Sequence, residues 1–313
     1  MIVRQAAFGG SEKLLKGNTH THTTRSDGVC TPEETIHIYA EKGYDFLALT
    51  DHSVYNFTNF APESGVLILP GTERDDAFPD SAWPLVPLIH CVHIVSIGSE
   101  SGNGFAQDER FHHLGMQTAK DAQYLIDETR AGRNLPIFCH PEWSGNTVRE
   151  IEALSDFSLM EIWNSGCVRC YDCDDQAAYW DELLCDGRVI YGVAADDAHS
   201  PEDMGVGYVC VRADKTVDSI LNALKTGAFY SSTGPEIYDF YVEDGVAYVK
   251  CSPAAKICFR FFRFPYGVHH GEGLTEAKAK IVCGSTYIRA EVFDAEGRCA
   301  WTNPIFLSDG QPV

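Results

Sequence analysis

Histidines and carboxylates whose spacing would let them share metal ions are the most informative feature of the sequence. His20 and His22 lie two positions apart in the stretch NTHTHTTRSDG. Alternate positions of a β-strand project to the same face, so both imidazoles can reach one site. Asp27 follows in the next loop, and His52 comes directly after the apolar run FLALT and Asp51. Four potential ligands within one strand–helix–strand unit predict a metal site.

The segment between these ligands has the signals of a helix. Thr31 suits the N-cap, Pro32 suits the first helical position, and Glu34 completes a capping box. We expect the helix to run to about Lys42 and to end at Gly43.

Further polar candidates follow predicted strands later in the chain. Glu73 comes just past the strand in GVLILPGTER, and His140 follows the short strand LPIFC. Asp197 and His199 follow the buried strand in RVIYGVAADDAHS. We expect Asp196, beside Asp197, to hydrogen-bond one of the ligands.

Histidines also occur within the predicted strand LIHCVHIVSIG. His90 and His93 lie three positions apart, so they face opposite sides of a regular strand and only one should reach a given site. The candidate metal ligands are His20, His22, Asp27, His52, Glu73, His93, His140, Asp197 and His199. Imidazole and carboxylate ligands suit Zn, Mn, Fe(II) or Mg, and a carboxylate such as Glu73 can bridge two ions. The set is too large for one tetrahedral ion and predicts two or three.

The predicted elements favour an α/β fold followed by an all-β unit. Strands alternate with helices to about Gly234, which indicates parallel strands with right-handed crossovers. One or two helices are expected over residues 107–131, with others over 148–154, 177–185 and 216–225. Because about six strand ends contribute polar candidates, a barrel fits better than an open sheet. From Pro235 only strands and Gly or Asp turns are expected. We therefore predict two domains: residues 1–234, and residues 235–313 as a small β-sandwich.

The composition limits the class of protein. The chain has 313 residues, of which 44% are hydrophobic and 22% charged, and a formal net charge of −21. This charge argues against a nucleic-acid backbone as the main partner, whereas a small anionic substrate is still possible because metal ions can invert the local field. No signal-peptide pattern and no membrane-spanning run is visible, so we expect a cytoplasmic location without a membrane partner. The sequence does not indicate an oligomeric state.

Twelve cysteines are many for this length. Without an export signal they are expected to be reduced thiols. Cys167, Cys170 and Cys173 form a CxxCxxC pattern that would suit zinc or part of an iron–sulfur cluster, but a fourth ligand at the usual spacing is missing. Free loop thiols, some lining the pocket, are the favoured interpretation.

Several ordered motifs resemble the PHP family, named for polymerase and histidinol phosphatase. They are THTHTTRSDG, LALTDH, PGTE, VHIVSIG, CHPEWSG and DDAHS, and they span about residues 16–234. The resemblance implies a distorted (β/α)7, TIM-like barrel with two or three metal ions at its C-terminal mouth. It implies that one ion is bound by His20, His22, Glu73 and Asp197. It further implies that Glu73 bridges to a second ion and that His52, His93, His140 and His199 complete the cluster.

Asp27 departs from the family pattern, because some members have a histidine at this position. Asp27 either binds an ion directly or positions a bound water or a neighbouring imidazole. The number of ions, two or three, depends on this choice. The segments AFYSSTGPEI and AWTNPIFL resemble a stand-alone branch of the family, whose members are mostly described as metal-dependent phosphoesterases.

The expected reaction is hydrolysis of a small phosphate mono- or diester, with hydroxide activated by the metal ions as the nucleophile. His199 or His52 would give a proton to the leaving group. Arg25 and Arg169 are candidates for binding a substrate anion. Trp143, Trp163 and Tyr55 are candidates for walls of the pocket. The alternatives are hydrolysis of a carboxylic or carbamate ester, and a domain that binds metal or ligand without turnover.

Overall fold

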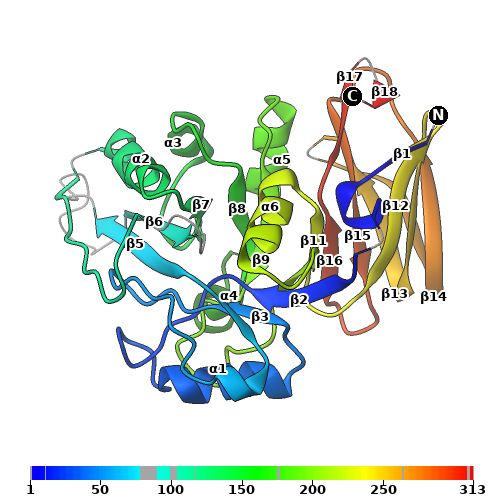
Figure 1. Cartoon of the computed structure of the whole chain (residues 1–313). Coiled ribbons are helices and arrows are strands. Elements are labelled where there is room, and N and C mark those ends of the chain that lie inside the picture. Colours follow the sequence, from blue (N-terminus) through cyan, green and yellow to red (C-terminus); the bar gives the residue numbers. More distant parts are fainter. Residues whose placement is uncertain are drawn as a thin grey trace.

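The computed structural model describes residues 2–10, 12–77, 90–98, 104–116, 118–174, 177–262, 264–308 and 311–312. The α/β part begins with three parallel strands, β2 (Leu14–Asn18), β3 (Phe46–Ala48) and β4 (Leu67–Leu69). Helix α1 (Pro32–Glu41) crosses from β2 to β3 (Figure 1). The predicted capping box is confirmed, since Thr31 accepts from the backbone N–H of Glu34 and Glu34 accepts from that of Thr31.

A second sheet contains β5 (Gly71–Ala77), β6 (Cys91–Ile97), β7 (Leu135–Phe138), β8 (Leu159–Asn164) and β9 (Tyr191–Ala195). Strands β7, β8 and β9 are parallel, as predicted, but β6 runs antiparallel to both β5 and β7. The prediction of uniformly parallel strands is wrong here, because the described residues between β4 and β6 contain no crossover helix. Glu73 accordingly lies inside β5 and not past a strand end.

The two sheets enclose a shared core, which includes Phe46, Val95, Ile137 and Val193. Isolated bridges tie the sheets together at the carboxyl ends of their strands, between Thr21 and Ala198 and between His52 and Glu73. Over the described residues the strand ladders form two sheets and not one continuous closed barrel. The mixed α/β class is confirmed, and closure of a (β/α)7 barrel stays a proposal.

Helices α2 (Gln123–Ala131), α3 (Val148–Glu152), α5 (Ala178–Cys185) and α6 (Val217–Thr226) lie near their predicted positions. The prediction for residues 107–131 is too long, because the described residues before the 3₁₀ turn Ala119–Ala122 are not helical. The predicted cysteine loop is also wrong. It forms helix α4 (Ser165–Tyr171), which Asn164 caps by accepting from the backbone N–H of Cys167 and which ends at Asp172 in the left-handed region.

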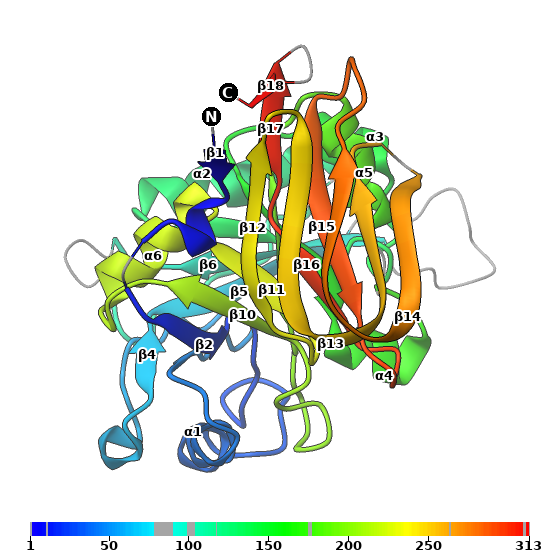
Figure 2. The same cartoon turned by 90° about the vertical axis from the view of Figure 1, so that its right-hand side faces the viewer.

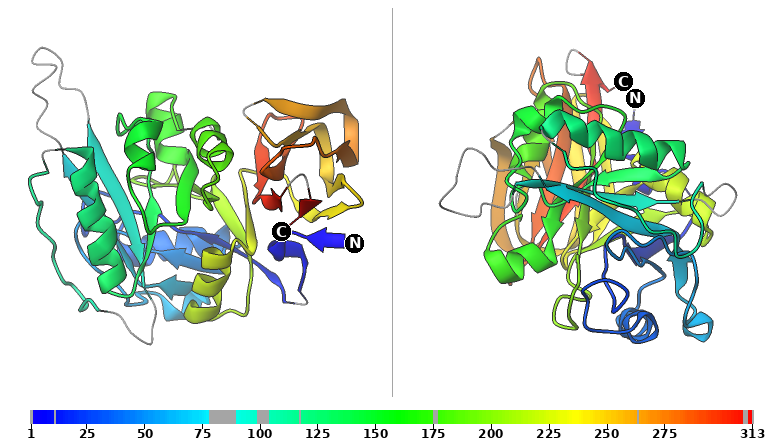
Figure 3. Two further views of the ribbon diagram at one scale, coloured as in Figure 1. Left: turned by 90° about the horizontal axis from the view of Figure 1, so that it is seen from above. Right: turned by 90° about the vertical axis from the view of Figure 1, so that its left-hand side faces the viewer.

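The C-terminal part contains antiparallel strands and packs beside the α/β part (Figures 2 and 3). Its strands are β12 (Ile237–Glu243), β13 (Val246–Arg260), β14 (Pro265–Lys280), β15 (Tyr287–Phe293), β16 (Cys299–Thr302), β17 (Ile305–Ser308) and β18 (Gln311–Pro312). Two connecting strands, β10 (Tyr208–Arg212) and β11 (Phe229–Ser232), join β2 to β16, so one sheet runs through both parts. Strand β1 (Ile2–Arg4) pairs with β12. The division into residues 1–234 and 235–313 stays a proposal.

A buried ion pair joins the two parts. Arg289 on β15 donates to both carboxylate oxygens of Asp181 on α5, at 2.8 and 2.7 Å, and contacts Glu291 at 2.9 Å. Tyr287 donates its hydroxyl to the same Asp181 at 2.8 Å. The Arg289 side chain is completely buried, so helix α5 and strand β15 are held by charge as well as by apolar packing.

Candidate metal centre

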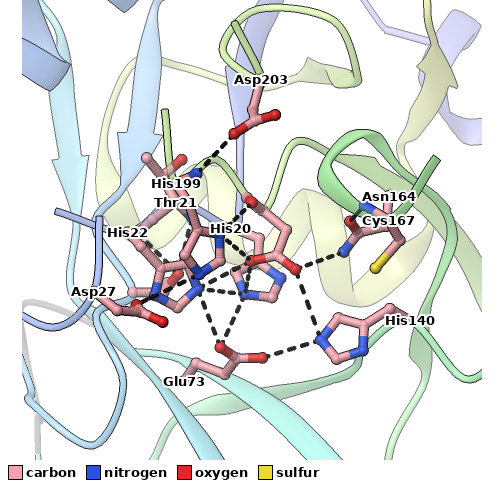
Figure 4. A network of polar contacts seen from close by, with 12 residues as sticks. His20, Thr21, His22, Asp27, Glu73, His140, Asn164, Cys167, His199 and Asp203 are labelled. Atoms are coloured by element: carbon pink, nitrogen blue, oxygen red, sulfur yellow. Dashed lines mark hydrogen bonds and ion pairs between the residues drawn. The ribbon is translucent and has the colours of Figure 1, made fainter. Parts of the chain in front are cut away.

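Four buried side chains form a cradle, three of them just past the carboxyl ends of β2 and β9 and the fourth, Glu73, inside β5 (Figure 4). His20 Nε2 lies 3.2 Å from His22 Nε2, from Glu73 Oε2 and from Asp197 Oδ1. His22 Nε2 lies 3.1 Å from Glu73 Oε2 and 3.0 Å from Asp197 Oδ1. Two nitrogens and two oxygens therefore converge on one point, from the segment that follows β2, from β5 and from the segment that follows β9.

The cradle fits a tetrahedral divalent ion. Ligand atoms about 2.0 Å from a central ion lie about 3.3 Å from each other, which is close to the observed separations. Glu73 Oε2 and Asp197 Oδ1 are buried oxygens without a hydrogen-bond partner among the described residues. Buried, unpaired carboxylate oxygens are costly unless a proton or a cation satisfies them. The donor set, two imidazoles and two carboxylates, is one that Zn, Mn and Fe(II) accept.

Glu73 also faces a second group of imidazoles. Its Oε1 lies 2.8 Å from His93 Nδ1 and 3.3 Å from His140 Nε2. His52 Nδ1 lies 3.1 Å from Glu73 Oε2. The two oxygens of one carboxylate thus point toward different imidazoles, the arrangement that a bridging ligand requires.

Asp27 lies at the rim, beside a third group of nitrogens. Its oxygens lie 3.4 Å from His199 Nε2, 3.6 Å from His22 Nδ1 and 3.9 Å from His52 Nε2. The Asp27 side chain is 56% exposed, whereas His22 is buried. The structure therefore brings all nine sequence-predicted ligands into one cluster, with Asp27 and His199 on its solvent side.

The backbone around the ligands is unusual and tightly packed. His140 and Asp197 have positive φ values, 22° and 48°, which non-glycine residues rarely adopt. Such strain concentrates at functional sites where the surrounding structure holds it. A Cβ on Gly28 would lie 2.7 Å from the His22 backbone, and one on Gly166 would lie 2.8 Å from the Asp197 carbonyl oxygen. Glycine is thus required where a loop and α4 approach the ligand backbone.

Glu161, on β8, is a site residue that the sequence reasoning missed. Its Oε1 lies 2.7 Å from His20 Nδ1, and its Oε2 accepts from the backbone N–H of His140 at 3.0 Å and from Asn164 Nδ2 at 2.9 Å. The available signal was a carboxylate in the middle of the buried strand SLMEIWN. Asp75 was missed as well, and its Oδ1 lies 3.2 Å from His52 Nδ1.

The prediction for Asp196 is wrong. Its carboxylate accepts from Tyr39 and Ser165 hydroxyls and from the backbone N–H groups of residues 205–207, and not from a candidate ligand. It holds the loop after β9 because three consecutive N–H groups converge on one buried carboxylate.

The carboxylates control the electrostatics of the cluster. Burial works against charge on His20 and His22, but Asp197 and Glu73 outweigh it and raise the pKa of both imidazoles. Burial likewise opposes ionisation of Glu73 and Asp197, yet the imidazoles hold their pKa values well below the usual range. For His140, burial lowers the pKa, but the hydrogen bond to Glu73 and the charges of Asp197, Glu73 and Glu161 together raise it to about 9. The carboxylates thus need nearby positive charge, which protons or divalent cations can supply.

A cavity of about 380 Å³ opens above the cluster. Arg169 and Trp143 line it, whereas Arg25 donates to Asn56 and pairs with Asp108 and is not among the described lining residues. The other two predicted wall residues also lie elsewhere. Trp163 packs against Trp301, and Tyr55 is buried and donates to Asn134.

The thiols of the CxxCxxC pattern differ in environment. Cys167 and Cys170 line the cavity, and Cys173 is half-buried. Among the described residues, one thiol belongs to a group that could hold an ion, that of Cys139 with His20 and Glu161. Cys167, Cys170 and Cys173 belong to none of these groups. His90 pairs with Glu150 at 3.2 Å, away from the cluster, as a structural role requires.

Comparison with known proteins gives one family match. Residues 184–229 match the family model PHP_C, described as PHP-associated. No curated protein was found to match. In the described part of the chain, no helix has the length and apolar character needed to cross a membrane.

Two solved structures illustrate the structural likeness. A two-domain protein from Bacteroides vulgatus, containing a predicted PHP-like metal-dependent phosphoesterase, is 15% identical over 90% of this chain and 91% of its own, with a TM-score of 0.47. An amidohydrolase from Chromobacterium violaceum, with bound sulfate and no metal, is 17% identical over 60% of this chain and 89% of its own, with a TM-score of 0.42.

Proposed function

We propose that this chain is a member of the PHP family and a metal-dependent phosphoesterase that hydrolyses a small phosphate mono- or diester. The observation that carries the proposal is the buried cradle of two imidazoles and two carboxylates, whose ligand atoms lie 3.0 to 3.2 Å apart. The cluster would lie at the mouth of a distorted (β/α)7 barrel formed by residues 1–234.

The chain's residues would hold two or three divalent ions, of which Mn, Zn and Fe are the candidates. The cradle, His20, His22, Glu73 and Asp197, would hold the first. The second would lie between Glu73 and the imidazoles of His52, His93 and His140. Asp27, with His22, His52 and His199 around it, has the composition of a third site, although it could instead orient a neighbouring imidazole.

Bound divalent ions would lower the pKa of a water molecule and offset the negative charge of a phosphoryl group. The protein would contribute ligand geometry and proton transfer. His199 is suited to give a proton to the leaving group, because its side chain is 38% exposed at the cavity. Burial works against its charge, but Asp27 and Asp197 outweigh burial and raise the pKa of His199. His52, 27% exposed and beside Asp75, is the second candidate.

Metal content and substrate class can be tested together. We would count metals per chain by elemental analysis and assay p-nitrophenyl phosphate, bis-p-nitrophenyl phosphate and an aryl carbamate in parallel. The proposal expects two or three ions and hydrolysis of a phosphate ester. Turnover of the carbamate alone would contradict the phosphoesterase proposal and favour hydrolysis of a carbamate ester. Metal binding without turnover of any substrate would favour a non-catalytic domain.

Variants test the cradle itself. His22→Ala and Asp197→Asn should each remove an ion and reduce activity by at least about a hundredfold, because each deletes a buried ligand. His37→Ala is the matched control, since His37 lies on the surface of α1 and pairs with Glu63 at 3.3 Å. Full activity in His22→Ala would contradict the metal mechanism.

A further inference from the structure

The wall of the cavity formed by α4 and the loop after β7 contains groups that the proposed hydrolysis does not use. Arg169 and Tyr171 come from α4, and Trp143 comes from the loop. Because α4 begins directly after β8 at its Asn164 cap, these α4 side chains are placed beside the ligand cluster.

Arg169 is held in place at the cavity by a buried carboxylate. Its Nε donates to Asp203, and its Nη2 donates to Ser200 Oγ at 3.4 Å. The Asp203 side chain is 2% exposed and also accepts from the backbone N–H groups of His199 and Ser200, at 3.2 and 2.9 Å. A guanidinium anchored on one edge keeps its remaining N–H groups available for a planar anion.

The remaining charges of the cavity make Arg169 distinctive. Among the described residues that line the cavity, Arg169 is the one arginine or lysine side chain. The same cavity is also lined by four carboxylates, those of Asp27, Glu73, Asp197 and Asp203. The Arg169 side chain is 48% exposed, so a ligand can reach it. An anionic group of a substrate would therefore find its one fixed arginine here.

Aromatic rings extend from the ligands to the rim. Trp143 stands edge-on to His140 at 5.1 Å and to Tyr171 at 6.0 Å between ring centroids, and Tyr171 is 61% exposed. The Trp143 loop is held by buried Asp174, which accepts from the backbone N–H groups of Glu142 and Trp143 at 2.9 and 2.7 Å. The backbone that carries Trp143 is therefore held in place, and the two rings offer apolar surface to a flat ring.

We infer that Trp143, Tyr171 and Arg169 form a leaving-group subsite for an aromatic ring that carries a second anionic group. The inference rests on the proposed function. The preferred substrate class is then an aryl phosphate monoester with an additional negative charge. In the reaction water adds to phosphorus, the phosphorus–oxygen bond to the ring breaks, and the ring oxygen receives a proton. Arg169 would bind the charge that stays on the released phenol.

Two esters that differ only in this charge test the inference. We would measure release of inorganic phosphate from phenyl phosphate and from 4-carboxyphenyl phosphate, with the ions loaded. Wild type should prefer the carboxylated ester. Arg169→Gln should lower kcat/KM for that ester by about ten- to a hundredfold, mainly through KM, and change the phenyl ester by less than about threefold. Arg169→Lys should restore only part of the preference, because it lacks the planar fork.

The controls separate recognition from structural damage and from failure of the proposed function. Arg130→Gln removes an exposed arginine that pairs with Asp156 at 2.9 Å and should leave the ratio between the two esters unchanged. An equal loss on both esters in Arg169→Gln, or no preference in wild type, would overturn the inference while hydrolysis itself persists. Absence of hydrolysis of either ester, with ions bound, would instead overturn the proposed function and this inference with it.

Discussion

Glu161 fixes the orientation of His20 from behind the cluster. Its Oε1 lies 2.7 Å from His20 Nδ1, and both side chains are buried. A partner on Nδ1 sets the tautomer that presents Nε2 to the cradle. Since the other carboxylate oxygen accepts from the backbone N–H of His140, Glu161 positions candidate ligands from two different strand ends.

Replacing Glu161 should therefore weaken metal binding without removing a ligand. In Glu161→Gln, an amide N–H would face either His20 Nδ1 or the donors of His140 and Asn164, so one contact is lost. We expect metal affinity to fall by about ten- to a hundredfold, measured by competition with a chelator. Glu296→Gln, on an exposed turn, is the control. Unchanged affinity in Glu161→Gln would show that His20 needs no orienting partner.

Removing Arg289 should destabilise the protein strongly. Arg289→Met would leave the Asp181 and Glu291 carboxylates, each 3% exposed, without their buried cation. We expect a loss of about 3 to 5 kcal/mol in the free energy of unfolding, measured by urea denaturation. Arg298→Met, which removes a 55% exposed partner of Asp294, should cost less than about 1 kcal/mol. Similar losses in both variants would mean that the buried pair contributes little.

Asp174 should make stability depend on pH in a defined direction. Burial raises its pKa to about 6, so its ionisation disfavours the folded state, and the associated stability is lost as the pH rises through about 6. When the pH falls from 7.5 to 5, the free energy of unfolding of the wild type should rise by more than about 1 kcal/mol relative to that of Asp174→Asn. Denaturation at both values, with Asp156→Asn as the exposed control, checks this. A pH-independent difference would contradict the raised pKa.

Gly166 should tolerate no side chain. Its Cβ would lie 2.8 Å from the Asp197 carbonyl oxygen, so Gly166→Ala must move α4 away from the ligand backbone. Because small displacements at a reacting site are costly, we expect kcat/KM to fall by about tenfold or more. Gly9→Ala is the control, since its Cβ would lie 4.0 Å from the Ala6 carbonyl oxygen. Normal activity in Gly166→Ala would show that α4 can shift freely.

The ligands were predictable because their signals are local. His20 and His22 lie close together in the sequence, just past the end of β2 and not on the predicted strand, and His52, Asp197 and His199 follow apolar runs. Glu73 was predicted as a ligand, but its position inside a strand was not. One residue, Pro70, separates β4 from β5, and the local sequence does not show that a new strand begins directly after it.

Other features depend on contacts between distant segments. The reversed direction of β6 and the pairing of β11 with β16 are set by tertiary packing, which no local pattern reveals. Glu161 looked like an ordinary residue of a buried strand, since its partners His20 and His140 are far away in sequence. The sequence predicts a loop at CVRCYDC, yet helix α4 forms over Ser165–Tyr171 behind the Asn164 cap, with Gly166 against the Asp197 backbone.

The pairing of β1 with β12 has a consequence for synthesis on the ribosome. Residues 2–4 are made well before their hydrogen-bond partners in residues 237–243. At about 5 to 20 residues per second, the first strand waits some tens of seconds for its neighbour. The α/β core can form in the meantime, because its strands β2 to β9 precede β12 in the chain. Strand β1 therefore becomes paired only after the strands of the α/β core have been made.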